Sequence, residues 1–250
     1  MEITLWGKFN QSLAIVEKNI RIYYSKGPVI IFGLLMPFFL FLSFYIGRNT
    51  PIETLIPGLL GMVAFFTATS VGPAIVPWEA RAKTLERLIS SPVSLRTIFM
   101  GDVLSSFVFG VLVSAVAATA SLLIGVSFVN PFLLFFGLVL STFCFASLSI
   151  LLSAYPPTDN IATTMMVSSM IKFPLIFISG VFIALEELPV WGKIVSALSP
   201  LTYFTDLARY SIQGTSYYPV AVDILALIAF TVAFLFIAIK IHERTILKRL

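Results

Sequence analysis

The sequence has little charge and almost none of the residues that form disulfides or bind metals. Only 11% of its 250 residues are charged, whereas 58% are hydrophobic and the mean hydropathy is +1.01. A soluble domain of this length needs more charge, so the composition predicts a membrane protein. The single cysteine, Cys144, excludes an internal disulfide, and the single histidine, His242, has no ligand set around it. We therefore expect no catalytic centre and no metal site.

Nucleotide-binding motifs are also missing. No G-x-x-x-x-G-K-[ST] sequence occurs, so the chain shows no sign of cradling nucleotide phosphates, and we expect it to bind no cofactor itself. The basic excess is 16 Lys and Arg against 12 Asp and Glu. The distribution of these residues in loops predicts membrane topology rather than a nucleic-acid partner. The first 26 residues are amphipathic, so no signal peptide is expected.

Long hydrophobic runs are abundant. A helix needs ~20 mostly apolar residues to cross the ~30 Å of bilayer hydrocarbon. Six runs meet this requirement, which predicts an all-α membrane protein with six transmembrane helices in a single domain over residues 1–250. The predicted spans are Pro28–Gly47, Leu55–Val76, Ile98–Val126, Pro131–Ala154, Thr163–Leu185 and Val220–Ile239.

Basic residues outside the spans are strongly biased to one side. Twelve of them lie in the N-terminal segment, the 78–97 loop and the C-terminal segment, whereas the opposite loops hold only three, Arg48, Lys193 and Arg209. Loops rich in Lys and Arg stay in the cytoplasm. We therefore expect a multi-pass protein of the cell membrane with both termini and the 78–97 loop in the cytoplasm.

Two segments are too polar or too short to span. Residues 5–24 predict an amphipathic helix lying in the inner interface, because Trp6, Phe9, Leu13, Val16, Ile20 and Tyr23 form one helical stripe. The alternative is an ordinary packed helix. Residues 186–219 predict two short helices in an external, re-entrant hairpin that acts as a gate. The residues expected to form this gate are Pro189, Trp191, Pro200, Tyr203 and Arg209.

The stretch from Trp78 to Pro92 places five charges between two apolar runs, so it predicts a loop or short helix in water or at the interface. Leu85, Leu88 and Ile89 share one helical face, and such a face beside mixed charges suits a groove in a soluble partner. The alternative is a solvated loop whose charges only set the topology. The charged and polar residues of this stretch are Glu79, Arg81, Lys83, Thr84, Glu86 and Arg87.

Lys172 is the one ionisable residue well inside a predicted span. Burying it costs ~3 kcal/mol, so a role in the transport pathway is one hypothesis. Snorkelling toward the inner surface is the alternative, and Pro174 could free the carbonyl of Met170 as an acceptor. Small residues in two spans predict close helix packing, within one subunit or at a dimer interface. They are Ala64, Ala68 and Gly72 in the second span and Gly110, Ser114 and Ala118 in the third.

Two motifs resemble the membrane subunit of a type-2 (ABC-2) ATP-binding-cassette exporter. TLERLISSPVS (Thr84–Ser94) follows the second span, and SGVFIALEELPVWGKIVSALSPLTYFTDLAR (Ser179–Arg209) begins at the end of the fifth. The resemblance covers nearly the whole chain, and the drug- and lipid-export branch matches best. Two positions depart from the family pattern: Ala184 replaces a common proline, and Asp102 stands where lysine is common.

The resemblance implies a half-transporter. Two membrane subunits, identical or different, would pair, and each would dock a cytoplasmic ATPase that holds ATP and Mg²⁺. The resemblance makes residues 78–92 the coupling loop and places Ala64–Gly72 at the subunit interface. It also adds Ser179 and Gly180 to Lys172 and Pro174 as candidates for the transport pathway. The expected substrate is an amphipathic drug, lipid or lipid-linked molecule. The alternatives are a polysaccharide or lipid-linked glycan exporter and an ATPase-independent scramblase or enzyme.

Overall fold

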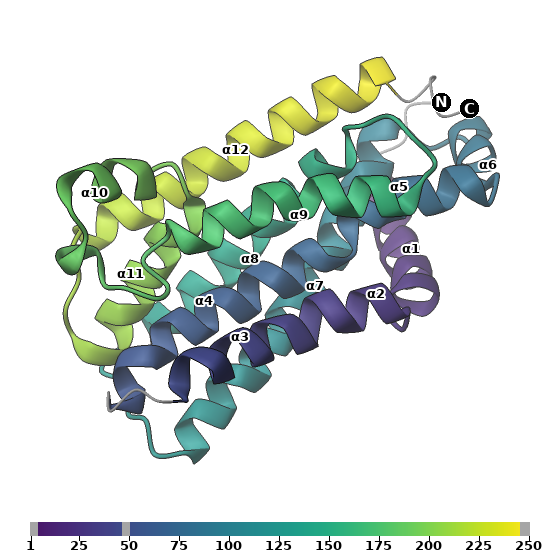
Figure 1. The fold of residues 1–250 in the computed structure, drawn as a ribbon. Coiled ribbons are helices and arrows are strands. Elements are labelled where there is room, and N and C mark those ends of the chain that lie inside the picture. The colour runs from purple at the N-terminus through teal and green to yellow at the C-terminus, as the bar shows by residue number, and fades with distance from the viewer. Residues whose placement is uncertain (1–4, 47–50, 246–250) are drawn as a thin grey trace.

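The computed structural model describes residues 5–46 and 51–245, and the side chains of Leu5, Trp6 and Lys8 are not described. Arg48, Lys248 and Arg249, which the topology prediction used, also lie outside the described residues. Within them every regular element is a helix. The long helices form an elongated bundle with short helices at each end (Figure 1). One end carries α1 (Leu5–Tyr23) and α6 (Thr84–Ser90), and the other carries α10 (Val190–Ser196) and α11 (Pro200–Gln213).

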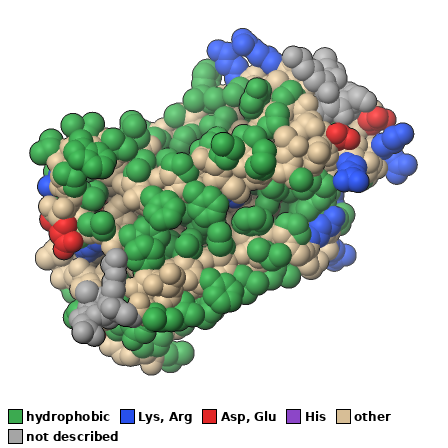
Figure 2. Space-filling view, in the orientation of Figure 1, with side chains coloured by type: hydrophobic (Ala, Val, Ile, Leu, Met, Phe, Trp, Pro, Cys, Tyr) green, Lys and Arg blue, Asp and Glu red, His purple; other side chains and the backbone are tan. Residues whose placement is uncertain are grey.

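Among residues 5–46 and 51–245, five helical segments are long and apolar enough to cross a membrane. They are Gly27–Tyr45 (α2, Gly27–Ile30; the π-helical turn η1, Ile31–Leu35; α3, Met36–Tyr45), Ile52–Arg81 (α4, Ile52–Ser70; α5, Gly72–Arg81), α7 (Leu95–Leu123), α8 (Pro131–Ser153) and α12 (Val220–Thr245). Hydrophobic side chains cover most of the visible face of the bundle, and charged side chains gather mainly at its two ends (Figure 2). This distribution fits a multi-pass membrane protein.

The predicted fifth span is shorter than expected. Its helix, α9 (Ile161–Phe177), has 17 residues, whereas the sequence predicted a span over Thr163–Leu185. The helix ends because the chain turns at Gly180, whose φ of +71° is accessible mainly to glycine. A 3-10 turn, η2 (Leu185–Glu187), then leads into α10.

The segment Ile52–Arg81 is the centre of the bundle, with 94% of its most apolar window buried inside the molecule. Its helix α4 packs against α7, α8 and α11. The added Cβ of an alanine at Gly72 would lie 2.1 Å from Ser149 Oγ of α8, and one at Gly110 would lie 3.0 Å from Ala68 Cβ. Ala64 and Ala68 are fully buried. The small residues Ala64, Ala68 and Gly72 therefore pack within the subunit, which corrects their assignment to a dimer interface.

The two short helices predicted within residues 186–219 are present as α10 and α11. Pro189 precedes α10, Pro200 is the first residue of α11, and Gly214 ends α11 in the left-handed conformation with φ of +79°. The two helices differ in environment, because α11 is buried against α4, α8 and α12 whereas α10 exposes much of its surface. Trp191, for example, is 71% exposed.

Candidate functional site

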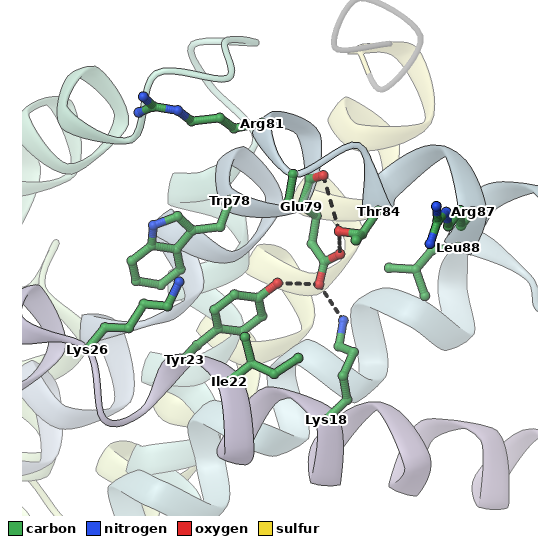
Figure 3. A pocket seen from close by; sticks show the side chains of 11 residues that line it. Lys18, Ile22, Tyr23, Lys26, Trp78, Glu79, Arg81, Thr84, Arg87 and Leu88 are labelled. Atoms are coloured by element: carbon green, nitrogen blue, oxygen red, sulfur yellow. Dashed lines mark hydrogen bonds and ion pairs between the residues drawn. The ribbon is translucent and has the colours of Figure 1, made fainter.

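A cavity of about 520 Å³ opens between α1, the end of α5 and α6 (Figure 3). In the predicted coupling loop, residues 78–81 continue α5, so the second long segment extends further than Leu55–Val76. A turn at Ala82 and Lys83 then leads into the separate helix α6. Lys83 adopts the left-handed conformation with φ of 55°, which allows the chain to reverse between the two helices.

The carboxylate of Glu79 joins the three elements around this cavity (Figure 3). It is 3% exposed and accepts hydrogen bonds from Lys18 Nζ at 2.5 Å and Tyr23 Oη at 2.6 Å, both on α1. Thr84 Oγ1, at the start of α6, donates to the other carboxylate oxygen. Burial, together with the hydrogen bond to Glu79, raises the pKa of Tyr23 far above its usual range, so the phenol stays protonated and donates. Glu79 is thus an internal link.

Aromatic rings and a lysine form the side of the cavity nearest the first span. Trp78 stacks on Tyr23 with ring centroids 5.1 Å apart and an interplanar angle of 6°. Lys26 Nζ lies 4.6 Å from the centroid of the Trp78 ring and 5.2 Å from that of Tyr23. This arrangement is a cation–π contact, which holds a positive charge beside an apolar surface.

Helix α6 has one side in the protein and one side in solvent. Leu85 is 3% exposed and packs with Val76 and Phe99 in a small core cluster. The expectation that it lies in a surface patch with Leu88 and Ile89 is therefore wrong. Helix α6 packs on α5, which draws Leu85 into the core and leaves the other two half-buried. Four charged side chains of the stretch are exposed to solvent, those of Arg81, Lys83, Glu86 and Arg87.

Lys172 lies in the interior of the bundle, 1% exposed, far from the cavity at α6. Its Nζ donates to Thr69 O on α4 at 3.4 Å and lies 6.0 Å from the centroid of the Phe32 ring. Met170 O is therefore not its acceptor, and the ammonium does not snorkel to the surface. Pro174 lies inside α9.

The other pathway candidates, Ser179 and Gly180, form the turn after α9. Ser179 is fully buried and donates to Ile176 O at 2.7 Å. Gly180 O accepts from Arg209 Nη2 at 3.4 Å. The structure therefore groups Ser179 and Gly180 with the predicted gate rather than with Lys172.

The predicted gate residues serve different contacts. Tyr203 Oη donates to Ala197 O at 3.0 Å and so ties α11 to the end of α10. Arg209 is 7% exposed and reaches the turn after α9. The sequence analysis missed Asp206, a fully buried residue that accepts hydrogen bonds from the backbone N–H groups of Tyr217 and Tyr218. Burial raises the pKa of Asp206, although these hydrogen bonds act in the opposite direction.

The contact of α1 with α7 was also missed. Asn19 Nδ2 donates to Asp102 Oδ1 at 2.7 Å and to Ser105 Oγ at 3.1 Å, and all three residues are buried. Of the predicted apolar stripe, Val16 and Tyr23 are buried, whereas Phe9, Leu13 and Ile20 are 41–49% exposed. The spacing of Ser12 and Asn19, seven residues apart, was the signal that a second, polar face packs on a neighbour.

The sequence profile of the ABC-2 type transporter family matches residues 10–213. The chain belongs to this family. It is 26% identical to the probable multidrug ABC transporter permease YbhR of Escherichia coli (strain K12) over 62% of its own length. This match spans 42% of the length of YbhR. The chain is also 26% identical to the inner membrane transport permease YadH of the same organism, over 77% of the chain and 75% of YadH.

A third relative is the putative transport permease ycf38 of Cyanophora paradoxa, which is 26% identical over 84% of the chain and 77% of its own length. The names of all three relatives describe permeases. Among residues 5–46 and 51–245, no group of three or more His, Cys, Asp or Glu side chains is placed to hold a metal ion.

Proposed function

We propose that this chain is the membrane-spanning subunit of an ATP-driven exporter in the cell membrane, with both termini in the cytoplasm. It pairs with a second permease subunit and couples, through α6, to a separate ATPase that binds ATP and Mg²⁺. Its substrate is an amphipathic drug, lipid or lipid-linked molecule, moved by alternating access. The name of YbhR, a probable multidrug permease, supports the drug-export branch.

The two-sided build of α6 carries the proposal. Its inner side is attached to the bundle through Leu85 and through the Thr84–Glu79 hydrogen bond. Its outer side presents Glu86 and Arg87 to solvent. A force applied by a partner at the outer side passes into α5 and α1, because buried contacts and a shared carboxylate connect all three helices. The side chains of Leu85 and Glu79 transmit that force without touching the partner.

The test is co-purification of the tagged chain with its cognate ABC ATPase, and the ATP hydrolysis that the pair performs. Glu86→Ala with Arg87→Ala should weaken association about 30-fold, because exposed interface side chains contribute on the order of 1 kcal/mol each. Arg96→Ala, an exposed residue at the same end that pairs with Glu243, is the matched control and should leave association unchanged. If the double variant and the control associate with the ATPase equally well, α6 is not the docking element.

A further inference from the structure

The cavity between α1, α5 and α6 has more positive charge than its own acid neutralises. Its lining contains one carboxylate, that of Glu79, and four basic side chains: Lys18, Lys26, Arg81 and Arg87. Glu79 is already bound by Lys18 and by two hydroxyl groups. Within the described part of the chain, the other three cations form no ion pair. Lys26, Arg81 and Arg87 are therefore available to an anion.

The surroundings of these cations are apolar on the side of the first span. Trp78 and Tyr23 stack beside Lys26, and Ile22, also in the lining, is 47% exposed. Ile20, on the same helix α1, is 41% exposed. Tryptophan and tyrosine concentrate where spanning helices meet the headgroup region, and exposed aliphatic side chains beside lysines are typical of helices that lie in the interface.

The position of the cavity along the bundle agrees with that level. Arg81 is the last residue of Ile52–Arg81, a segment long and apolar enough to cross a membrane, so the cavity opens at the end of a candidate span. Its volume of about 520 Å³ is within the range of sites that hold small molecules. Basic pockets between membrane helices at the cytoplasmic surface are suited to anionic lipid headgroups.

We propose that this cavity binds the phosphate headgroup of an anionic phospholipid from the adjoining leaflet. Lys26 and Arg81 contact the phosphate, and the acyl chains lie along the exposed aliphatic side of α1 at Ile20 and Ile22. The proposal takes the cytoplasmic position of this end of the bundle from the proposed function, in which both termini lie in the cytoplasm. The bound lipid would hold α1 against α5 beside the docking helix.

An acidic side chain of the ATPase is the competing occupant of another class. Figure 3 favours the lipid, because Trp78, Lys26 and Arg81 lie on one side of Glu79, while Arg87 and Leu88 of α6 lie on the other. The docking surface proposed above is the α6 side. The side of the cavity with Trp78 and Lys26 is apolar and aromatic, so its surface is the part least complementary to a soluble acidic partner.

Trp78 itself is the reporter for a test. The full-length W6F/W191F variant retains Trp78 as its sole tryptophan. It is reconstituted in phosphatidylcholine vesicles that contain a small fraction of one brominated lipid. This lipid is either brominated phosphatidylglycerol or brominated phosphatidylcholine, and the bromine on its acyl chains quenches tryptophan on contact. We expect stronger quenching of Trp78 by the brominated phosphatidylglycerol at equal mole fraction. The same protein with inorganic phosphate in place of the anionic lipid tests for a soluble occupant.

The charge variant is Lys26→Gln with Arg81→Gln in this background. Each cation near an anionic membrane surface changes affinity by about fivefold, so the pair should lower the apparent affinity for brominated phosphatidylglycerol roughly 25-fold. The matched control, Lys83→Gln with Arg96→Gln, removes the same charge at the same end from residues outside the cavity, and it should keep the wild-type preference. Quenching is expressed relative to unbrominated lipid, which corrects for the lost cation–π contact.

Four results would overturn the proposal. Equal quenching by the two brominated lipids would exclude a headgroup site, and equal losses in the two charge variants would assign the preference to general surface charge. A Trp78 response to inorganic phosphate that displaces the lipid would assign the site to a soluble anion. If the protein shows no lipid preference and K26Q/R81Q loses association with the ATPase, the occupant of the cavity would be the ATPase. Lipid preference and ATPase association are separate readouts, so either proposal can fail alone.

Discussion

The two ends of the bundle use buried carboxylates in opposite ways. At the α6 end, Glu79 receives side-chain donors from two other helices, and most of the surrounding charges remain on the surface. At the α10 end, Asp206 receives backbone N–H groups of a single loop, and Arg209 is buried with it. The first arrangement joins a short helix to two others, whereas the second holds a turn in place. The difference predicts that the α6 end tolerates change at its surface and the α10 end does not.

The largest effect should come from Gly58→Ala in α4, near the α10 end. The added Cβ would lie 2.2 Å from the carbonyl oxygen of Val181, a backbone atom that cannot rotate away. We expect a loss of about 3 kcal/mol, measured by thermal unfolding in detergent. Gly27→Ala, toward the other end, adds a Cβ with nothing within 4 Å and should be neutral. Similar unfolding temperatures for the two variants would contradict the rigid contact.

The next effect tests the internal link at the α6 end. Glu79→Ala leaves Lys18, Tyr23 and Thr84 without their shared acceptor, and we expect a loss of about 2 kcal/mol. Glu86→Ala removes the same charge from the exposed side of α6 and should change stability by less than about 0.5 kcal/mol. Thermal unfolding in the same detergent separates the two, and a Glu86 variant as unstable as the Glu79 variant would mean that α6 has no solvent side.

Asp206→Asn tests the α10 end by pH. Burial raises the pKa of Asp206 above the ordinary value of 3.8, so the folded state binds a proton more readily than the unfolded state. The associated stability is fully present below 3.8 and is lost as pH rises through the raised pKa. The wild type should therefore gain stability relative to the variant as pH falls into this window, by about 1.5 kcal/mol at most.

Unfolding temperature as a function of pH measures this difference, with the exposed Asp159→Asn as a control for charge. A pH dependence that is identical in wild type and Asp206→Asn would show that the burial of Asp206 is not coupled to folding.

The smallest effect should lie in the turn between α5 and α6. Lys83 has φ of 55°, a conformation that costs a β-branched residue more than lysine and costs glycine little. Lys83→Val should lose about 1 kcal/mol relative to Lys83→Gly. Chemical unfolding of the two variants measures this, and equal stability would indicate that the turn relaxes.

Much of the fold could be predicted because a membrane leaves few choices. Hydrocarbon requires every backbone group to bond internally, so apolar runs such as Pro131–Ala154 become helices with nearly the predicted ends. The two short helices predicted within residues 186–219, which prolines and a glycine delimit, are likewise present as α10 and α11. The fifth span was overestimated because apolar residues such as Val181 and Phe182 continue beyond the helix, where Gly180 turns the chain.

The site was predicted in outline only. The position of α6 follows from its charges, but which of its side chains face inward depends on what it packs against. An i, i+3, i+4 pattern groups Leu85 with Leu88 and Ile89, and the structure buries Leu85 alone in the cluster around Phe99. The pairings of Glu79 with Lys18 and of Asp102 with Asn19 join residues more than sixty positions apart, which no local pattern encodes.

The sequence by itself determined a helical membrane protein, the order and approximate length of its helices, and the charged stretch between the second and third spans, because hydropathy and backbone hydrogen bonding act locally. Only the tertiary structure decided which small residues pack inside the subunit, that Lys172 is enclosed by Thr69 and Phe32, and that one carboxylate, Glu79, unites α1, α5 and α6. These contacts arise where helices distant in sequence meet, since burial and partner geometry are properties of the packed bundle.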